Sequence, residues 1–163
     1  MSYEKLYESV YSSENRVRLL RAAGLISLFM TVTAYLFFLG VAFYIGVDMG
    51  IKFILITGIP FVLVSILRHI ASAPRPYEIF PNFGKYGIRT RGGDSFPSRH
   101  VFSAFVIGVA GMLFSAVIGS IVLVLGVAIG ACRVLLGIHF LRDVIAGALI
   151  GAASGLIGLW IFL

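Results

Sequence analysis

Four polar or ionisable residues stand in a strongly apolar stretch near the end of the chain: Cys132, Arg133, His139 and Asp143. Such groups are costly in apolar surroundings and usually serve a function there. His139 and Asp143 are four positions apart, so on a helical turn the carboxylate could orient and charge the imidazole. Arg133 could reach the same place if the chain bends before His139, and Gly137 permits a bend.

These residues alone leave two interpretations open. In one, the histidine and the aspartate form half of a catalytic relay on which the arginine converges. In the other, the arginine and the histidine lie at a membrane boundary with the aspartate as counter-ion. Three glycines continue the same four-residue spacing after Asp143: Gly147, Gly151 and Gly155. Small residues at this spacing let a neighbouring helix approach closely, so we expect the ionisable pair to face inward.

The composition indicates an integral membrane protein. Of the 163 residues, 60% are hydrophobic and 12% are charged, and the mean hydropathy is +1.03, which excludes a soluble domain with a polar surface. Five apolar segments take up most of the chain: residues 22–46, 50–67, 98–118, 120–138 and 140–163. We therefore predict an all-α, five-span transmembrane helix bundle, placed in a bacterial plasma membrane.

The remaining segments set the predicted domain organisation. Residues 1–21 carry apolar and charged side chains at helical spacing, which predicts an interfacial amphipathic helix before a single transmembrane domain at residues 22–163. Residues 68–97 are rich in proline and glycine and predict a loop at the level of the lipid headgroups, whose part from Tyr77 to Asp94 would select the headgroup. A tight turn is expected at Gly119 and Ser120.

The distribution of charge indicates which classes of binding partner are expected. The net charge is +6, and the basic residues stand beside the apolar segments, which favours anionic lipids or phosphorylated headgroups over nucleic acid. One cysteine and three histidines offer no zinc-ligand spacing, so we expect no metal. Glycine faces serve packing within and between chains equally, so the sequence sets no oligomeric state.

Two further polar clusters are expected on the same membrane face as His139. They are Arg68, His69 and Arg75 after the second predicted span and Ser98, Arg99 and His100 before the third. The start of the third span would present free backbone N–H groups and a positive helix dipole to an anion. Arginine forks suit phosphate oxygens. Histidines and arginines gathered at one face thus predict phosphoryl chemistry.

Three motifs resemble those of the type 2 phosphatidic acid phosphatase (PAP2) family of membrane lipid phosphatases. The chain reads Arg68, six residues, Arg75-Pro76; then Pro97-Ser98-Arg99-His100; then Cys132-Arg133, five residues, His139, three residues, Asp143. The order and the spacing are those of the family, and the resemblance covers residues 51–163. The family has lysine, glycine and serine where this chain has Arg68, Arg99 and Cys132.

The resemblance implies an enzyme that uses neither metal nor cofactor and works through a phosphohistidine. His139 would be the nucleophile, Asp143 would hold its ring, and His100 would protonate the leaving group and then activate water. The phosphate would be bound by Arg68, Arg75, Ser98, Arg99 and Arg133. His69 matches no motif position and is expected to be a boundary residue.

The expected substrate is a phosphorylated or diphosphorylated lipid that enters sideways from the bilayer. Undecaprenyl diphosphate, phosphatidylglycerophosphate and phosphatidic acid are the candidates. Two alternatives stay open: a lipid phosphotransferase, and a membrane protein that binds anionic lipids without catalysis.

The charge distribution also predicts an orientation. With five spans, the predicted site and the N-terminus share one face, which holds all of the 13 Lys and Arg residues except Lys52. The positive-inside rule places this face in the cytoplasm. The family resemblance implies the opposite, because relatives with six spans usually open their site to the outer face. We expect the cytoplasmic face, since Arg16, Arg18 and Arg21 owe nothing to catalysis.

Overall fold

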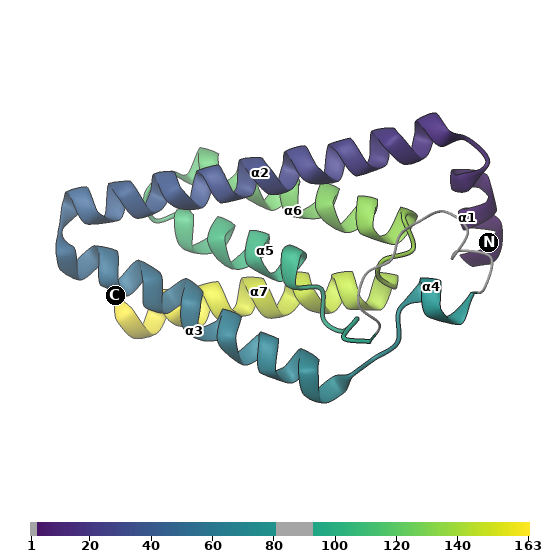
Figure 1. The fold of residues 1–163 in the computed structure, drawn as a ribbon. Helices are drawn as coiled ribbons and strands as arrows, with labels where there is room; N and C mark the ends of the chain where they lie inside the picture. Colours follow the sequence, from purple (N-terminus) through teal and green to yellow (C-terminus); the bar gives the residue numbers. More distant parts are fainter. Residues whose placement is uncertain (1–2, 81–92) are drawn as a thin grey trace.

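The computed structural model describes residues 3–80 and 93–163, and these residues form helices and no strands (Figure 1). The helices are α1 (Tyr3–Tyr11), α2 (Glu14–Ile45), α3 (Val47–Ala71), α4 (Pro76–Ile79), α5 (Arg99–Gly111), α6 (Ala116–Leu135) and α7 (Leu141–Phe162). The predicted all-α fold class is confirmed for this part of the chain.

The bundle is organised around α5, which contacts α2, α3, α6 and α7. The short helices α1 and α4 lie at one end of the bundle, on the right in Figure 1. The same end holds the last turns of α3 and α6 and the first turns of α5 and α7. The predicted motifs are on these turns, so the fold gathers them at one end.

Among the described residues, four helices are long and apolar enough to cross a membrane: α2, α3, α6 and α7. Large apolar side chains cover their outer surfaces, as with Leu19, Phe29 and Trp160, which are 69%, 73% and 85% exposed. Such surfaces are stable against lipid tails and not against water. The predicted span at residues 98–118, and with it the total of five spans, is not confirmed, because α5 has 13 residues and is about 20 Å long, against a hydrocarbon core of about 30 Å.

The predicted turn at Gly119 and Ser120 is wrong. Helix α5 ends at Gly111 and α6 begins at Ala116, so both residues lie inside α6. Ser115 caps α6, because its side chain accepts a hydrogen bond of 3.3 Å from the backbone N–H of Ile118. Met112, Leu113 and Phe114, which precede Ser115 between the two helices, are apolar, so no marked change in hydrophobicity indicates this turn.

Two other helices extend beyond their apolar segments. Helix α2 begins at Glu14 rather than at residue 22, and α3 runs from Val47 to Ala71 rather than over 50–67. Arg68 therefore lies in a helix and not in the predicted loop 68–97. Charged side chains continue a helix outside the hydrocarbon layer, as in the 2.7 Å ion pair between Arg18 and Glu14.

The N-terminal helix packs on the protein. Tyr7, Val10 and Tyr11 of α1 are buried in one cluster with Leu136, and the Tyr11 hydroxyl donates a 2.9 Å hydrogen bond to the Leu136 carbonyl. The predicted apolar face of α1 thus packs against the connection between α6 and α7. A position of α1 at the membrane interface stays a prediction.

Helices α5 and α7 approach closely along the predicted glycine face. A Cβ added at Gly147 would lie 2.7 Å from the Ser98 carbonyl oxygen, and one added at Gly151 would lie 2.5 Å from that of Phe102. Both distances are below van der Waals contact, and backbone cannot give way as a flexible side chain can. Any larger residue would therefore push the two helices apart.

We expect Gly151→Ala to lower the stability of the protein by about 1–3 kcal/mol, the usual cost of overpacking. Gly40→Ala is the matched control, because a Cβ added there meets nothing within 4 Å. It should leave stability unchanged or raise it by up to ~1 kcal/mol through helix propensity. Thermal unfolding of both variants in one detergent measures the difference, and equal melting temperatures would contradict the close packing.

Candidate functional site

The turn between α6 and α7 brings Arg133 and His139 together. Gly137 adopts φ +66°, a left-handed conformation that favours glycine, and the backbone N–H of His139 donates to the Arg133 carbonyl at 3.3 Å. The predicted bend at Gly137 is therefore confirmed. His139 itself lies just before α7, which begins at Leu141, and not within a helix as one interpretation required.

Asp143 lies in the first turn of α7 and is fully buried. Its Oδ2 accepts hydrogen bonds from the Phe140 backbone N–H at 2.9 Å and from the Ser95 hydroxyl at 2.6 Å. The distance from Oδ2 to His139 Nδ1 is 3.7 Å, which is too long for a direct hydrogen bond. Ser95 Oγ lies 3.3 Å from the same nitrogen and so connects the two side chains.

Sequence reasoning missed Ser95. The residue stands three positions before Ser98 in a stretch without helical periodicity, and no spacing rule links it to His139 or Asp143, 44 and 48 positions away. The only available signal was a hydroxyl directly ahead of the second motif.

Ser98 caps the start of α5 and is fully buried. In the part of the chain described, its Oγ has no hydrogen-bond partner, and a buried polar atom of this kind calls for a ligand or another explanation. Its backbone N–H donates to the Asp143 carbonyl at 3.0 Å. The backbone N–H of Ser98 is therefore occupied within the protein, and its hydroxyl is available to an anion.

The arginines of the first motif line the same end of the bundle. Arg68 is 5% exposed and donates to the Pro97 carbonyl at 3.2 Å, and Arg75 is 9% exposed and donates through Nε to the Gly93 carbonyl at 3.0 Å. Arg68 also interacts electrostatically with Arg75, Arg99 and Arg133. Like charges repel one another, so an anion bound among them would be stabilised.

The same charges act on His139. Burial lowers the pKa of its imidazole below the ordinary value of 6.5; the nearby Asp143 carboxylate opposes this change, and Arg75, Arg133 and Arg68 add to it. Because the pKa is lowered, the ring is neutral at neutral pH and keeps a lone pair. A neutral imidazole among cations can act as a nucleophile towards an anion.

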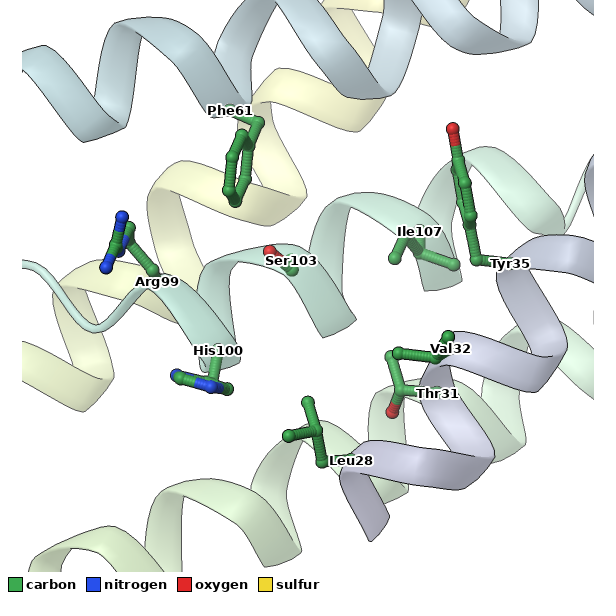
Figure 2. Close-up of a pocket in the computed structure, with 9 residues that line it drawn as sticks. All are labelled: Leu28, Thr31, Val32, Tyr35, Phe61, Arg99, His100, Ser103 and Ile107. Carbon is green, nitrogen blue, oxygen red and sulfur yellow. The ribbon is translucent and has the colours of Figure 1, made fainter. Parts of the chain in front are cut away.

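A groove of about 410 Å³ is lined by two of the predicted site residues, Arg99 and His100 (Figure 2). Figure 2 shows Arg99 and His100 at one end of it and Tyr35 near the other. Its wall comes from α2, α3 and α5 and consists of Leu28, Thr31, Val32, Tyr35, Phe61, Arg99, His100, Ser103 and Ile107. His100 also interacts electrostatically with His139 and Arg133. The groove is of a size that suits small-molecule and lipid ligands.

The structure thus brings most of the predicted residues together. They are Arg68, Arg75, Ser98, His100, Arg133, His139 and Asp143. Arg99 is exposed and lines the groove, while His69 is exposed at the last turn of α3 and takes no part. The segment expected to select the headgroup, Tyr77 to Asp94, falls largely outside the described residues, because 81–92 are among those not described.

Comparison with known proteins agrees with this arrangement. The PAP2 superfamily matches residues 49–163. The bacitracin transport permease protein BcrC of Bacillus licheniformis is 37% identical over 99 residues, which cover 61% of this chain and 48% of that protein. The chain therefore matches about half the length of this curated relative.

Two solved structures share the fold. Aquifex aeolicus LpxE has a TM-score of 0.61 and 28% identity, over 88% of this chain and 93% of that one. A transmembrane PAP2-type phosphatidylglycerolphosphate phosphatase from Bacillus subtilis has a TM-score of 0.65 and 18% identity, over 98% and 91% of the two chains. The match of most of the chain defines the class: this protein belongs to the PAP2 superfamily and is a multi-pass membrane protein.

Proposed function

We propose that the protein is a phosphatase of a phosphorylated or diphosphorylated membrane lipid and that it works through a phosphohistidine on His139. One observation carries the proposal: the buried His139 imidazole lies near three arginines, and the Ser95 hydroxyl connects it to a buried carboxylate. Membership in the PAP2 superfamily and the solved structure named as a phosphatase support the same reaction.

In the first step, His139 Nε2 attacks phosphorus and the bond from phosphorus to the lipid oxygen breaks. His100 donates a proton to the departing oxygen, which leaves as an alcohol or, from a diphosphate, as a monophosphate. Arg68, Arg75, Arg133 and the Ser98 hydroxyl stabilise the charge on the phosphoryl oxygens. Because these cations belong to the protein, the step requires no metal ion. Arg99, which is exposed and lines the groove, would bind a second phosphate.

In the second step, water attacks the phosphorus of the phosphohistidine. His100 now accepts a proton from that water, the bond from phosphorus to nitrogen breaks, and inorganic phosphate leaves. The same group serves as acid and then as base, so one histidine suffices for both steps. A phosphotransferase would differ only in the acceptor, with the hydroxyl of another lipid replacing water.

The groove supports a lipid as substrate. Its wall between Leu28 and Ile107 is largely apolar, and its polar end holds Arg99 and His100. An acyl or isoprenoid chain would fill the apolar part and place its phosphate beside the arginines. Undecaprenyl diphosphate, phosphatidylglycerophosphate and phosphatidic acid all have this form and stay the candidate substrates.

We also propose that the site faces the cytoplasm of a bacterial cell. In this proposal α5 and its flanking turns cross the plasma membrane together with α2, α3, α6 and α7, which gives five crossings. Arg16, Arg18 and Arg21 are close to the start of α2, at the same end of the bundle as α1, α4 and the site (Figure 1). The positive-inside rule places such a cluster in the cytoplasm. The lipid would then be taken from the inner leaflet.

The three histidines of the chain form a natural series of variants. His139→Ala should lower the release of inorganic phosphate from lipid phosphates by roughly 10⁴-fold or more, the effect of losing a nucleophile. His100→Ala should lower it by roughly 10²- to 10⁴-fold, and less for a substrate with a good leaving group, because the acid is then needed less. His69→Ala is the matched control and should leave turnover unchanged. The assay uses purified protein in detergent with each candidate lipid.

The same series separates the alternatives. Full activity of His139→Ala would exclude the phosphohistidine mechanism. Turnover of the wild type only in the presence of a second lipid, without inorganic phosphate, would favour a phosphotransferase. Tight lipid binding without turnover of any candidate would favour a binding protein without catalysis.

The groove predicts that kcat/KM depends on the length of the lipid chain of the substrate. Ser103→Phe should place a ring inside the groove and lower the kcat/KM for a long-chain lipid phosphate by ~10-fold or more, with little change for a short-chain, water-soluble analogue. Ser120→Phe is the matched control, because Ser120 is exposed on α6. Equal losses on the long and the short substrate would mean that the lipid chain lies elsewhere.

The orientation is tested with single cysteines in a Cys132→Ser background. Glu8 is exposed on α1 at the end of the bundle that holds the site, and Asp48 is exposed at the start of α3, at the opposite end. In intact cells a membrane-impermeant thiol reagent should label the Asp48→Cys variant and spare the Glu8→Cys variant until the cells are permeabilised. The reverse pattern would place the site on the outer face.

A further inference from the structure

The Ser95 hydroxyl lies between the side chains of His139 and Asp143. Its Oγ is 2.6 Å from Asp143 Oδ2 and 3.3 Å from His139 Nδ1, while the histidine nitrogen and the carboxylate oxygen are 3.7 Å apart. All three side chains are buried, with exposed fractions of 0%, 1% and 0% for Ser95, His139 and Asp143. The hydrogen-bonded connection from the carboxylate to the ring therefore passes through the serine.

The direction of the hydrogen bonds follows from the chemistry of the groups. An ionised carboxylate can only accept, so the single hydroxyl hydrogen of Ser95 points to Asp143. The serine oxygen can then only accept from His139, which requires a hydrogen on Nδ1. The ring is left with its lone pair on Nε2, the nitrogen on the far side from Ser95 and Asp143. This is the tautomer that a nucleophilic Nε2 needs.

The position of Ser95 is itself fixed from two sides. Its backbone N–H donates to the Ala73 carbonyl at 2.9 Å, in the segment that follows α3. Three residues later the chain reaches Ser98, whose backbone N–H is bonded to the Asp143 carbonyl at 3.0 Å. The backbone around Ser95 is thus bonded to the segment that follows α3 and to the first turn of α7, and this holds the hydroxyl in place, as a group that orients another side chain requires.

We propose that Ser95 is a positioning residue for the nucleophile: its hydroxyl holds His139 in the Nδ1–H tautomer and connects the ring to Asp143. The role rests on the phosphohistidine mechanism proposed above. When Nε2 bonds to phosphorus and the bond to the lipid oxygen breaks, the ring becomes a cation that keeps its Nδ1 hydrogen. Ser95 and Asp143 stabilise that cation through the existing hydrogen bonds, and no proton moves to the carboxylate.

Kinetics give the first test. Ser95→Ala should lower kcat for the preferred lipid phosphate by roughly 10- to 100-fold, the usual effect of removing a group that orients a histidine, and should leave KM unchanged. Ser95→Thr keeps the hydroxyl and should recover part of the loss. Ser27→Ala is the matched control, because Ser27 is a buried serine of α2 outside the site. Wild-type kcat in Ser95→Ala would overturn the proposal.

The tautomer gives a second test that needs no turnover. In protein labelled with ¹⁵N at histidine, with His69→Ala and His100→Ala variants to assign the three rings, His139 should show the Nδ1–H tautomer. In Ser95→Ala the Nε2–H tautomer should become populated, and the Ser27→Ala spectrum should match the wild type. An Nε2–H ring in the wild-type protein would overturn the proposal even if Ser95→Ala failed to fold.

The two proposals fail in different ways. If the wild type hydrolyses no lipid phosphate but His139 responds to Ser95→Ala as expected, the function is wrong and the positioning role stands. If the wild type is active and neither kcat nor the tautomer changes in Ser95→Ala, the function stands and the positioning role is wrong.

Discussion

The interaction on which the site depends is the burial of the Asp143 carboxylate at the start of α7. A carboxylate without exposure is costly unless donors surround it. Here Oδ2 accepts from the Phe140 backbone N–H and the Ser95 hydroxyl. Among the described residues Oδ1 has no hydrogen-bond partner and lies 3.5 Å from the Arg142 guanidinium, and the start of a helix favours a negative charge. The carbonyl of the same residue accepts from Ser98 at the start of α5. One residue therefore fixes α7, α5 and the Ser95 segment relative to one another, and Gly147 allows the approach because it has no Cβ.

The positive charges impose the second constraint. Arg68 and Arg75 are almost fully buried, and each donates to a backbone carbonyl, of Pro97 and of Gly93. These bonds shape the segment before α5 around the guanidinium groups, and they leave the repulsion among the arginines in place. A bound phosphate would reduce that repulsion. On the proposed function, the substrate thus stabilises the folded state of the site that binds it.

The sequence predicted which residues meet at the candidate site better than it predicted the helix boundaries. The motif spacing identified residues that the fold brings together, and Gly137 and the glycine face predicted the bend and the close approach of α5 and α7. The motif residues, the bend and the close approach depend on the type of residue at single positions, which can be read directly from the sequence. The turn before Ser115 could not be predicted, because the residues on both sides of it are apolar. The end of α3 could not be predicted either, because charged residues continue this helix beyond its apolar segment. Ser95 was missed because its partners are distant in sequence and meet it only in the folded chain.

The part of the chain outside the family match shapes access to the site. The PAP2 superfamily matches residues 49–163, whereas Leu28, Thr31, Val32 and Tyr35 of α2 line the groove. Tyr11 of α1 donates to the Leu136 carbonyl, three residues before His139, and so supports the turn that carries His139. Different segments of the chain would therefore determine the reaction, which is common to the family, and the choice of substrate, which is particular to this chain. On the proposed function, the C-terminal helices supply the phosphoryl chemistry and the N-terminal helices decide which lipid chain reaches it.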